Sequence, residues 1–342
     1  MEAIKVLIVD DSATVRQVLT RELAKDAGLQ VVGAAPDPFA ARELMQLHQP
    51  DILTLDLEMP RLDGLSFLKR LMEHRPMPVI VVSSLTPQGS ALALQAMEAV
   101  ALDVLGKPGI AYGVGELAPQ LIARLKALGR VRVAKKVAAV GPMVLPGLSK
   151  TTNQVLAIGA STGGTEALRR MLAMLPPDAP GTMIVQHMPP GFTAQFAQRL
   201  NECCKIHVKE AEHGDIISPG ICLVAPGDRH LLLRRDGAIY RADLRDGPKV
   251  GLHKPAVDVL FRSVAQIAGA NAIGVLLTGM GRDGADGLKL LQGAGSPTIA
   301  QDEASCVVWG MPGEAVKLGA ADQILPLDQI PGAILNLARK HG

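Results

Sequence analysis

The stretch Val-Leu-Ala-Ile-Gly-Ala-Ser-Thr-Gly-Gly, residues 155–164, joins a short apolar strand to a glycine-rich turn. The apolar run at 155–158 predicts a buried strand, and the pattern after the turn predicts an amphipathic helix over 165–175. Further apolar strands are expected at 183–186 and near Ile221, Leu231 and Ile273. This alternation of strands and helices predicts a Rossmann-like α/β domain built on parallel strands.

The same alternation fills the first part of the chain and predicts a separate domain there. Five short apolar runs, separated by amphipathic stretches, lie at 6–9, 31–34, 52–55, 79–82 and 103–105. They predict a doubly wound, five-stranded parallel sheet of the flavodoxin-like type, closed by a helix over 117–128. Because residues 130–152 have no clean period, we expect the chain to divide into an N-terminal domain at 1–125, a linker at 126–152 and a C-terminal domain at 153–342.

Length and composition limit the classes of function. A chain of 342 residues suggests two domains of about 150 residues each. A net charge of +2 and an aromatic content of 2% argue against nucleic acid or anionic lipid as a partner. The apolar runs are shorter than the roughly 20 residues of a membrane-spanning helix, and the N-terminus lacks a basic signal segment. We therefore expect a cytoplasmic protein without membrane insertion, whose four cysteines stay reduced.

Acidic residues follow the strands of the N-terminal domain. Asp10 and Asp11 end the first strand, Asp56 ends the third, Ser83 ends the fourth and Lys107 follows the fifth. The carboxyl ends of parallel strands meet at one edge of the sheet, so these side chains are expected to converge. Clustered carboxylates call for a hard cation such as Mg²⁺. Asp56 could then attack a phosphodonor, with Lys107 balancing the new charge and Ser83 binding a phosphoryl oxygen. Any one of these aspartates could equally cap a turn, and their agreement at several strand ends favours the phosphoryl site.

Four sequence segments strengthen the interpretation as a phosphoryl site. The segments are Val-Asp-Asp-Ser at 9–12, Asp-Leu-Glu-Met-Pro-Arg-Leu-Asp-Gly at 56–64, Val-Ser-Ser at 82–84 and Lys-Pro at 107–108. Together they resemble a response-regulator receiver domain over about the first 125 residues. The resemblance implies that Asp56 is the phosphorylated residue and that Asp10, Asp11 and Asp56 bind Mg²⁺ with the main-chain carbonyl of Glu58. Val104 stands where many receivers carry an aromatic switch residue, so an aromatic readout is not expected.

Three polar residues follow strands of the C-terminal domain. Ser161 lies on the tight turn after the strand at 155–158, His187 follows the next strand, and Asp283 lies in the glycine-rich loop after Leu277. These residues fit a nucleophile, a general base and an orienting acid, with helix N-terminal N–H groups near the serine. The order Ser, His, Asp differs from that of α/β-hydrolases. Each feature taken singly has another explanation. The glycines of the turn could let a helix pack close to the sheet, His187 could bind the backbone, and Asp283 could cap a loop.

Longer motifs in this half point to one family. They are Gly-Ala-Ser-Thr-Gly-Gly at 159–164, Gln-His-Met-Pro at 186–189, Ala-Pro-Gly-Asp-Arg-His at 225–230, His-Lys-Pro-Ala-Val-Asp-Val-Leu-Phe at 253–261 and Leu-Thr-Gly-Met-Gly-Arg-Asp-Gly-Ala at 277–285. Residues 153–340 resemble the chemotaxis protein-glutamate methylesterase family, CheB. Lys254 stands where this family is expected to carry arginine, which bears on contacts with the substrate chain.

The resemblance implies a methylesterase whose catalytic triad is Ser161, His187 and Asp283, with Thr162 and Met280 in the oxyanion region. It implies phosphorylation-activated hydrolysis of glutamate methyl esters on methyl-accepting chemoreceptors, deamidation of receptor glutamines, and a chemotaxis histidine kinase as phosphodonor. No cofactor is expected in the catalytic domain, and Mg²⁺ is expected in the receiver. A receiver lying across the Ser161 face would block a bulky substrate until it is phosphorylated.

Two other classes compete with this interpretation. The glycines at 159, 163 and 164 also resemble a dinucleotide-binding turn, but His187 stands where an acid for a ribose hydroxyl is wanted. A receiver joined to a DNA-binding output module is the other alternative, and alternating α/β segments with polar strand ends argue against it. Failure to bind NAD(H) would argue against the first alternative. Loss of activity in Ser161→Ala with the fold retained would argue against the second.

Overall fold

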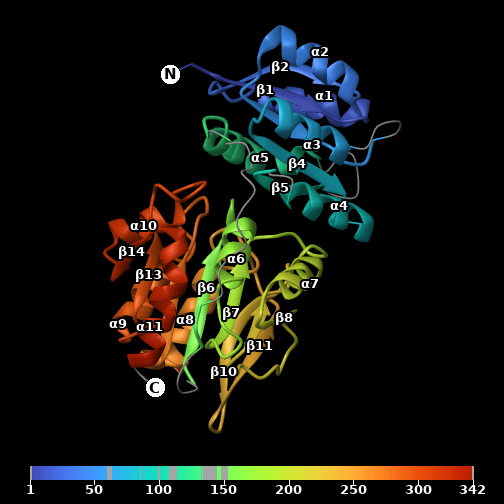
Figure 1. Ribbon diagram of the computed structural model, residues 1–342. Coiled ribbons are helices and arrows are strands. Elements are labelled where there is room, and N and C mark those ends of the chain that lie inside the picture. The colour runs from blue at the N-terminus through green and yellow to red at the C-terminus, as the bar shows by residue number, and fades with distance from the viewer. Residues whose placement is uncertain are drawn as a thin grey trace. The chain divides into compact units, whose positions relative to one another are not determined.

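The computed structural model describes residues 2–59, 64–84, 86–98, 101–107, 114–131, 133, 145–147 and 153–340. The chain divides into two compact units, residues 1–139 and 140–342, and each is described by itself (Figure 1). Most of the predicted linker at 126–152 lies outside the described residues, so the predicted boundaries stay predictions. Among the described helices, none has the length and apolar composition that crossing a bilayer requires.

The N-terminal unit contains the predicted five-stranded parallel sheet, in the order β2-β1-β3-β4-β5. Its strands are β1 (Ile4–Val9), β2 (Leu29–Ala35), β3 (Ile52–Leu55), β4 (Val79–Ser84) and β5 (Asp103–Lys107). The helices between and after them are α1 (Ala13–Leu23), α2 (Pro38–His48), α3 (Gly64–His74), α4 (Pro87–Glu98) and α5 (Val114–Leu128). Order and direction match the doubly wound flavodoxin-like prediction.

Local sequence explains where these elements begin. The Ser12 hydroxyl accepts the Val15 N–H and caps α1, and the Asp37 carboxylate caps α2 just before a proline at its first position. Every residue of β3 is buried, as expected for a central parallel strand covered on both faces. The carboxyl end of β3 therefore delivers Asp56 directly from the core to the edge of the sheet.

The C-terminal unit is built on a seven-stranded sheet with the order β14-β13-β12-β6-β7-β9-β8, in which the paired strands are all parallel. Its strands are β6 (Val155–Ala160), β7 (Gly181–Gln186), β8 (His207–Glu210), β9 (Ile221–Val224), β12 (Ala272–Leu276), β13 (Thr298–Gln301) and β14 (Gln323–Leu325). A separate antiparallel hairpin is formed by β10 (His230–Asp236) and β11 (Ile239–Arg245). The strand predicted near Leu231 therefore belongs to this hairpin and not to the main sheet.

Helices enclose the large sheet. They are α6 (Gly164–Leu172), α7 (Thr193–Cys203), α8 (Val257–Ile267), α9 (Ala285–Gly293), α10 (Met311–Lys317) and α11 (Ile330–Lys340), with 3-10 turns η2 (Gly269–Asn271) and η3 (Leu327–Gln329). Helix α6 packs on α7 and α11, whereas α9 packs on α8 and α10. Every residue of β6, β7 and β12 is buried between these helices. The three central strands of the sheet are therefore completely buried, as is the neighbouring strand β13.

The predicted end of helix α6 is wrong. Helix α6 ends at Leu172, with Ala173 as its C-cap, whereas the sequence pattern predicted that it continues to residue 175. Apolar residues continue past the helix because Leu175 is fully buried in the following turn. Pro176 also disfavours the helical conformation at Leu175. The apolar pattern therefore predicted the burial of Leu175 correctly, but it predicted too long a helix.

Candidate active site

Ser161 directly follows β6 and precedes α6, two elements that are neighbours in Figure 1. The turn is tight because Gly163 has a φ of +78° and the Gly164 N–H donates to the Ser161 carbonyl at 2.7 Å. The Ser161 N–H donates to the carbonyl of Thr278, which follows β12, at 3.0 Å. These bonds fix the serine between two neighbouring strands of the sheet, beside the N-terminus of a helix, where backbone N–H groups favour negative charge.

His187 and Asp283 form a buried pair at the same edge of the sheet. His187 directly follows β7, and its Nε2 lies 2.8 Å from Oδ2 of Asp283, which follows β12. Both side chains are nearly inaccessible to solvent, with 4% and 3% exposed. The strand order β12-β6-β7 brings Ser161, His187 and Asp283 to three adjacent strand ends, as the sequence predicted.

Backbone groups hold the Asp283 carboxylate in place. Its Oδ2 also accepts the Val257 N–H at 2.8 Å, and its Oδ1 accepts the Asp258 N–H at 2.9 Å, both from the start of α8. Burial alone raises the pKa of Asp283, but the His187 hydrogen bond and these two N–H groups outweigh burial and hold the pKa below its usual value. Asp283 is therefore an ionised hydrogen-bond acceptor at neutral pH.

The second ring nitrogen of His187 is available for proton transfer. Nδ1 is buried and has no hydrogen-bond partner among the described residues, whereas Nε2 is held by Asp283. The hydroxyl of Ser161 therefore makes no hydrogen bond to His187 in this conformation. Bonds between a nucleophile and its base are often long before substrate binds. With Nε2 protonated toward the aspartate, Nδ1 is the basic nitrogen that can accept a proton.

Thr162 and Met280, the residues expected near an oxyanion, lie on two loops beside Ser161. Thr162 follows Ser161 and is buried, and its carbonyl accepts the Thr278 hydroxyl at 3.0 Å. Met280 is partly exposed and follows Gly279, where an added Cβ would lie 2.8 Å from Cβ of Ser161. The loop that carries Met280 can pass this close to the serine only because residue 279 has no side chain.

Two residues that contact the pair were not predicted to have a role there. His253 stacks on His187 with ring centroids 3.7 Å apart and an interplanar angle of 4°. Asp258 lies beside Asp283, and burial, together with the charges of Asp283 and Asp286, raises its pKa to about 6. Both residues lie in the motif at 253–261, so the motif marked the segment without indicating these contacts.

The acidic cluster predicted for the N-terminal unit is assembled. Oxygens of Asp10, Asp11 and Asp56 lie within 4.8 Å of one another, with Asp10 and Asp56 buried and Asp11 exposed. The Lys107 ammonium group lies 2.8 Å from Asp10 Oδ2 and 2.6 Å from Asp56 Oδ2. The Glu58 N–H donates to Asp56 Oδ1 at 3.1 Å. The four strand-end residues therefore converge on one site.

Electrostatics at this cluster suit a divalent cation. Burial raises the pKa of Asp10 even though Lys107 opposes the shift. Burial lowers the pKa of Lys107, but the charges of Asp56 and Asp10 outweigh burial and hold that pKa above its usual value. Three carboxylates facing one ammonium group leave excess negative charge, and their oxygens are the ligands that Mg²⁺ prefers. The residues present therefore fit Mg²⁺.

Ser83, which was predicted to bind a phosphoryl oxygen, and Val104, which replaces the aromatic switch residue of many receivers, are both buried. Ser83 is fully buried, and its hydroxyl donates to the Gly89 carbonyl of α4 at 3.3 Å. Val104 is buried in β5 opposite Val81 of β4. Pro108 and residues 60–63 of the receiver motifs lie outside the described residues. A phosphoryl contact from Ser83 would require its hydroxyl to leave the Gly89 carbonyl.

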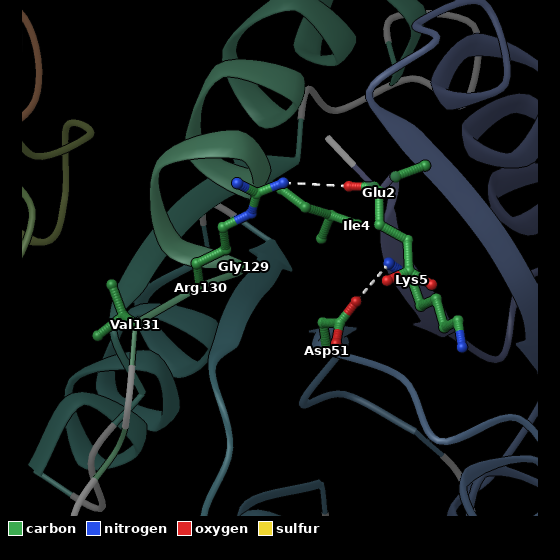
Figure 2. A pocket seen from close by; sticks show the side chains of 8 residues that line it. Glu2, Ile4, Lys5, Asp51, Gly129, Arg130 and Val131 are labelled. Carbon is green, nitrogen blue, oxygen red and sulfur yellow. Dashed lines mark hydrogen bonds between the residues drawn. The ribbon is translucent and has the colours of Figure 1, made fainter.

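A hollow of about 540 Å³ lies elsewhere in the N-terminal unit (Figure 2). It is lined in part by Lys5, whose N–H donates to Asp51 at 2.8 Å, and by Arg130, which donates to the Glu2 carbonyl at 3.0 Å. Ile4 begins β1 and Asp51 precedes β3, so this hollow lies at the amino ends of the strands. It is therefore separate from the carboxylate cluster, which lies at the carboxyl ends.

Comparison with known proteins identifies a family for each of the two units. Residues 156–334 match the family model of the CheB methylesterase, and residues 6–111 match that of the response regulator receiver domain. A protein of Anaeromyxobacter dehalogenans (strain 2CP-C) named protein-glutamate methylesterase/protein-glutamine glutaminase 4 is 56% identical over 99% of this chain and 96% of its own length. A protein of Syntrophus aciditrophicus (strain SB), with the same name but number 2, is 53% identical over 98% of this chain and 100% of its own length.

The catalytic unit also resembles a solved structure. The crystal structure of the Thermotoga maritima CheB methylesterase catalytic domain is 39% identical in sequence and superposes with a TM-score of 0.53. The match covers 55% of this chain and 100% of that chain. Fold, sites and comparisons together define a response-regulator receiver joined to a carboxylic ester hydrolase. The chain belongs to the CheB methylesterase family.

Proposed function

We propose that this protein removes methyl groups from glutamate methyl esters of methyl-accepting chemoreceptors and deamidates receptor glutamines, as part of chemotactic adaptation in the cytoplasm. The observation that carries the proposal is the buried hydrogen bond of 2.8 Å between His187 and Asp283, on strand ends that flank Ser161. The names of the relatives with 56% and 53% identity supply the substrate class, a glutamate or glutamine side chain of a protein.

The catalytic steps follow from the positions of the three side chains. His187 Nδ1 accepts the proton of the Ser161 hydroxyl as Oγ attacks the ester carbonyl, and Asp283 stabilises the resulting imidazolium through Nε2. Backbone N–H groups near Thr162 and Met280 hold the oxyanion. His187 returns the proton to the leaving group, which departs as methanol. Water then attacks the acyl-enzyme and releases a glutamate carboxylate.

A glutamine amide would react by the same sequence, with ammonia as the leaving group. Protonation by His187 matters more in that case, because an amide nitrogen leaves only after it gains a proton. The Asp283 carboxylate, which stays ionised at neutral pH because its pKa is lowered, favours the charged imidazolium that supplies this proton. One triad therefore suffices for both activities.

The receiver would control this reaction. Asp56 accepts a phosphoryl group from a chemotaxis histidine kinase, Lys107 pairs with the new charge, and Ser83 moves to bind a phosphoryl oxygen. Asp10, Asp11 and Asp56, with the main-chain carbonyl of Glu58, would hold Mg²⁺, which when bound neutralises charge on the transferred group. Phosphorylation then raises the activity of the esterase toward the receptor.

Methanol release from methylated receptor tests both halves of the proposal. Wild type, Ser161→Ala and Asp56→Asn are assayed with and without Mg²⁺ and a small-molecule phosphodonor. We expect release that the phosphodonor stimulates in wild type, that is absent in Ser161→Ala and that is unstimulated in Asp56→Asn. No release by wild type under any condition would contradict the esterase assignment. Equal stimulation of Asp56→Asn would contradict the assignment of the phosphorylated residue.

A further inference from the structure

A two-residue turn lies directly beside the proposed base. Val250 and His253 form an isolated antiparallel bridge, with N–H to carbonyl distances of 3.0 Å in both directions. Gly251 and Leu252 between them have φ angles of +57° and +74°, the signature of a type I′ turn. A Cβ added at Gly251 would meet no atom within 4 Å, so the tip of this 250–253 turn projects into open space.

Leu252 is an unusual residue for this position. Its side chain is 86% exposed, more than any other large apolar side chain recorded as exposed in the described part of the chain. Its positive φ is strained for a residue with a branched side chain, and glycine or asparagine would fit better. A strained backbone that displays an apolar side chain to solvent gives no stability to the fold. Such outliers are typical of functional positions.

Hydrogen bonds from two side chains hold the segment that carries the 250–253 turn. His230 is buried and links both sides of the segment, since its Nε2 lies 2.9 Å from the Pro248 carbonyl and its Nδ1 lies 3.3 Å from the Ala256 N–H. Lys254, the residue that departs from the expected arginine, donates to Asp246 at 2.8 Å and closes the segment. Leu252 is therefore presented on a preorganised support.

The turn is also coupled to the catalytic residues. His253 completes the 250–253 turn, and its ring stacks on His187 at 3.7 Å. Leu252 is thus one residue away from a side chain that touches the base. The 250–253 turn is therefore held against the proposed base through His253. The occupant assigned to its surface is the protein segment that brings a glutamyl ester to Ser161, because that segment has to reach the same base.

We infer that Leu252 is a specificity-determining residue, which packs against an apolar side chain of the receptor segment carrying the reacting ester. The inference rests on the proposed function and specifies how that site binds its substrate. Contact with Leu252 adds binding energy remote from the reacting bond, so it acts on the protein substrate and not on a small ester. Removing it should raise KM while leaving the chemical step intact.

Leu252→Ala and Leu252→Gly in the full-length protein test this inference, with Leu47→Ala as matched control. Leu47 is an exposed leucine, 73% accessible, in α2 of the other unit. Methanol release from methylated receptor and hydrolysis of p-nitrophenyl acetate are measured for each. We expect both Leu252 variants to raise the receptor KM about tenfold, with kcat and small-ester hydrolysis within about twofold of wild type.

The two variants separate side chain from backbone. Glycine removes the side chain and relieves the strain at positive φ, whereas alanine removes the side chain and keeps the strain. A wild-type receptor KM in Leu252→Gly would overturn the inference, and so would an equal loss of small-ester hydrolysis in both variants. If wild type hydrolysed the small ester but released no methanol from receptor, the proposed function itself would fail, which is a distinguishable result.

Discussion

Nε2 of His187 and Oδ2 of Asp283 lie 2.8 Å apart although 96 residues separate them in the chain. The same Oδ2 accepts the Val257 N–H, and Oδ1 accepts the Asp258 N–H. An ionised carboxylate satisfies all three donors, and no other side chain of similar size can. The identity of residue 283 is therefore constrained by its backbone contacts as well as by its proposed catalytic role.

Asp283→Asn should lower kcat by roughly 10³-fold, because the amide cannot stabilise the imidazolium and one donor is left facing an NH₂ group. Steady-state methanol release measures this effect. Asp286→Asn is the control, since Asp286 lies three residues away, is exposed and pairs with Arg282. A wild-type kcat in Asp283→Asn would show that the Asp283 carboxylate takes no part in the reaction.

Gly163→Ala should destabilise the catalytic unit by about 2 kcal/mol or more, because the residue has positive φ and its new methyl group would meet Val307. The added Cβ would lie 2.6 Å from Val307. Gly293→Ala is the matched control, where the same change meets no atom within 4 Å in α9. The sequence contains a single tryptophan, Trp309, so urea unfolding followed by its fluorescence reports this unit. Equal stabilities of the two variants would contradict the tight-turn account.

Gln186→Glu should lower kcat with little change in KM. Nε2 of Gln186 donates to the carbonyls of Ser161 at 2.9 Å and His187 at 3.1 Å, so it ties the nucleophile to the base. A glutamate of the same shape has no donor and places negative charge against both carbonyls, which should cost about tenfold in kcat or more. Gln329→Glu, at an exposed position in η3, is the control. An unchanged kcat in Gln186→Glu would show that this tie does not position the site.

Mg²⁺ should bind the N-terminal unit more weakly at pH 4 than at pH 8. The pKa of Asp10 is raised, and the cation needs the ionised form, so protons compete with Mg²⁺ as the pH falls through that pKa. Asp11→Asn should weaken binding at both pH values, and Glu73→Gln, an exposed change on α3, should not. Calorimetric titration measures the affinities. A pH-independent affinity would remove Asp10 from the ligand set.

Asp258→Asn should stabilise the catalytic unit at pH 7. The folded pKa of about 6 lies above the ordinary value of 3.8, so the folded state holds this proton more tightly than the unfolded chain. The contribution of Asp258 to stability is fully present below about pH 4 and is lost as the pH rises to about 6. Asparagine abolishes this slope and gains about 1 kcal/mol at pH 7 after allowance for solvent screening. Trp309 fluorescence in urea between pH 4 and 8 measures it, and an unchanged slope would contradict the shifted pKa.

Strand ends were the part of the sites that sequence could predict. The apolar run at 52–55 is β3, and its end places Asp56 beside Asp10 and Lys107, as expected. Ser161, His187 and Asp283 were found in the same way. The rule works because parallel strands that are buried on both faces have an unmistakable composition and a common edge. The catalytic and phosphorylation roles of these residues remain predictions.

Contacts between segments that lie far apart in the sequence could not be predicted. The stack of His253 on His187 depends on the path of a segment without periodicity, and the raised pKa of Asp258 depends on how deeply α8 packs. The bond from Ser83 to Gly89 follows from the close approach of α4 to β4. None of these distances is encoded in the pattern of neighbouring residues, since each joins segments placed by tertiary packing.

The strand order of the catalytic sheet also has a consequence for refolding. Strand β6 pairs in register with β12, so Val155 lies opposite Ala272, and the Ser161 N–H can reach the Thr278 carbonyl only after this long chain segment has been closed. Parallel pairing between distant segments forms slowly, because the entropy of loop closure is lost before the contacts compensate for it. Esterase activity regained after dilution from denaturant should therefore lag behind the recovery of helical circular dichroism. The time at which activity returns then reports when the catalytic sheet has finished forming.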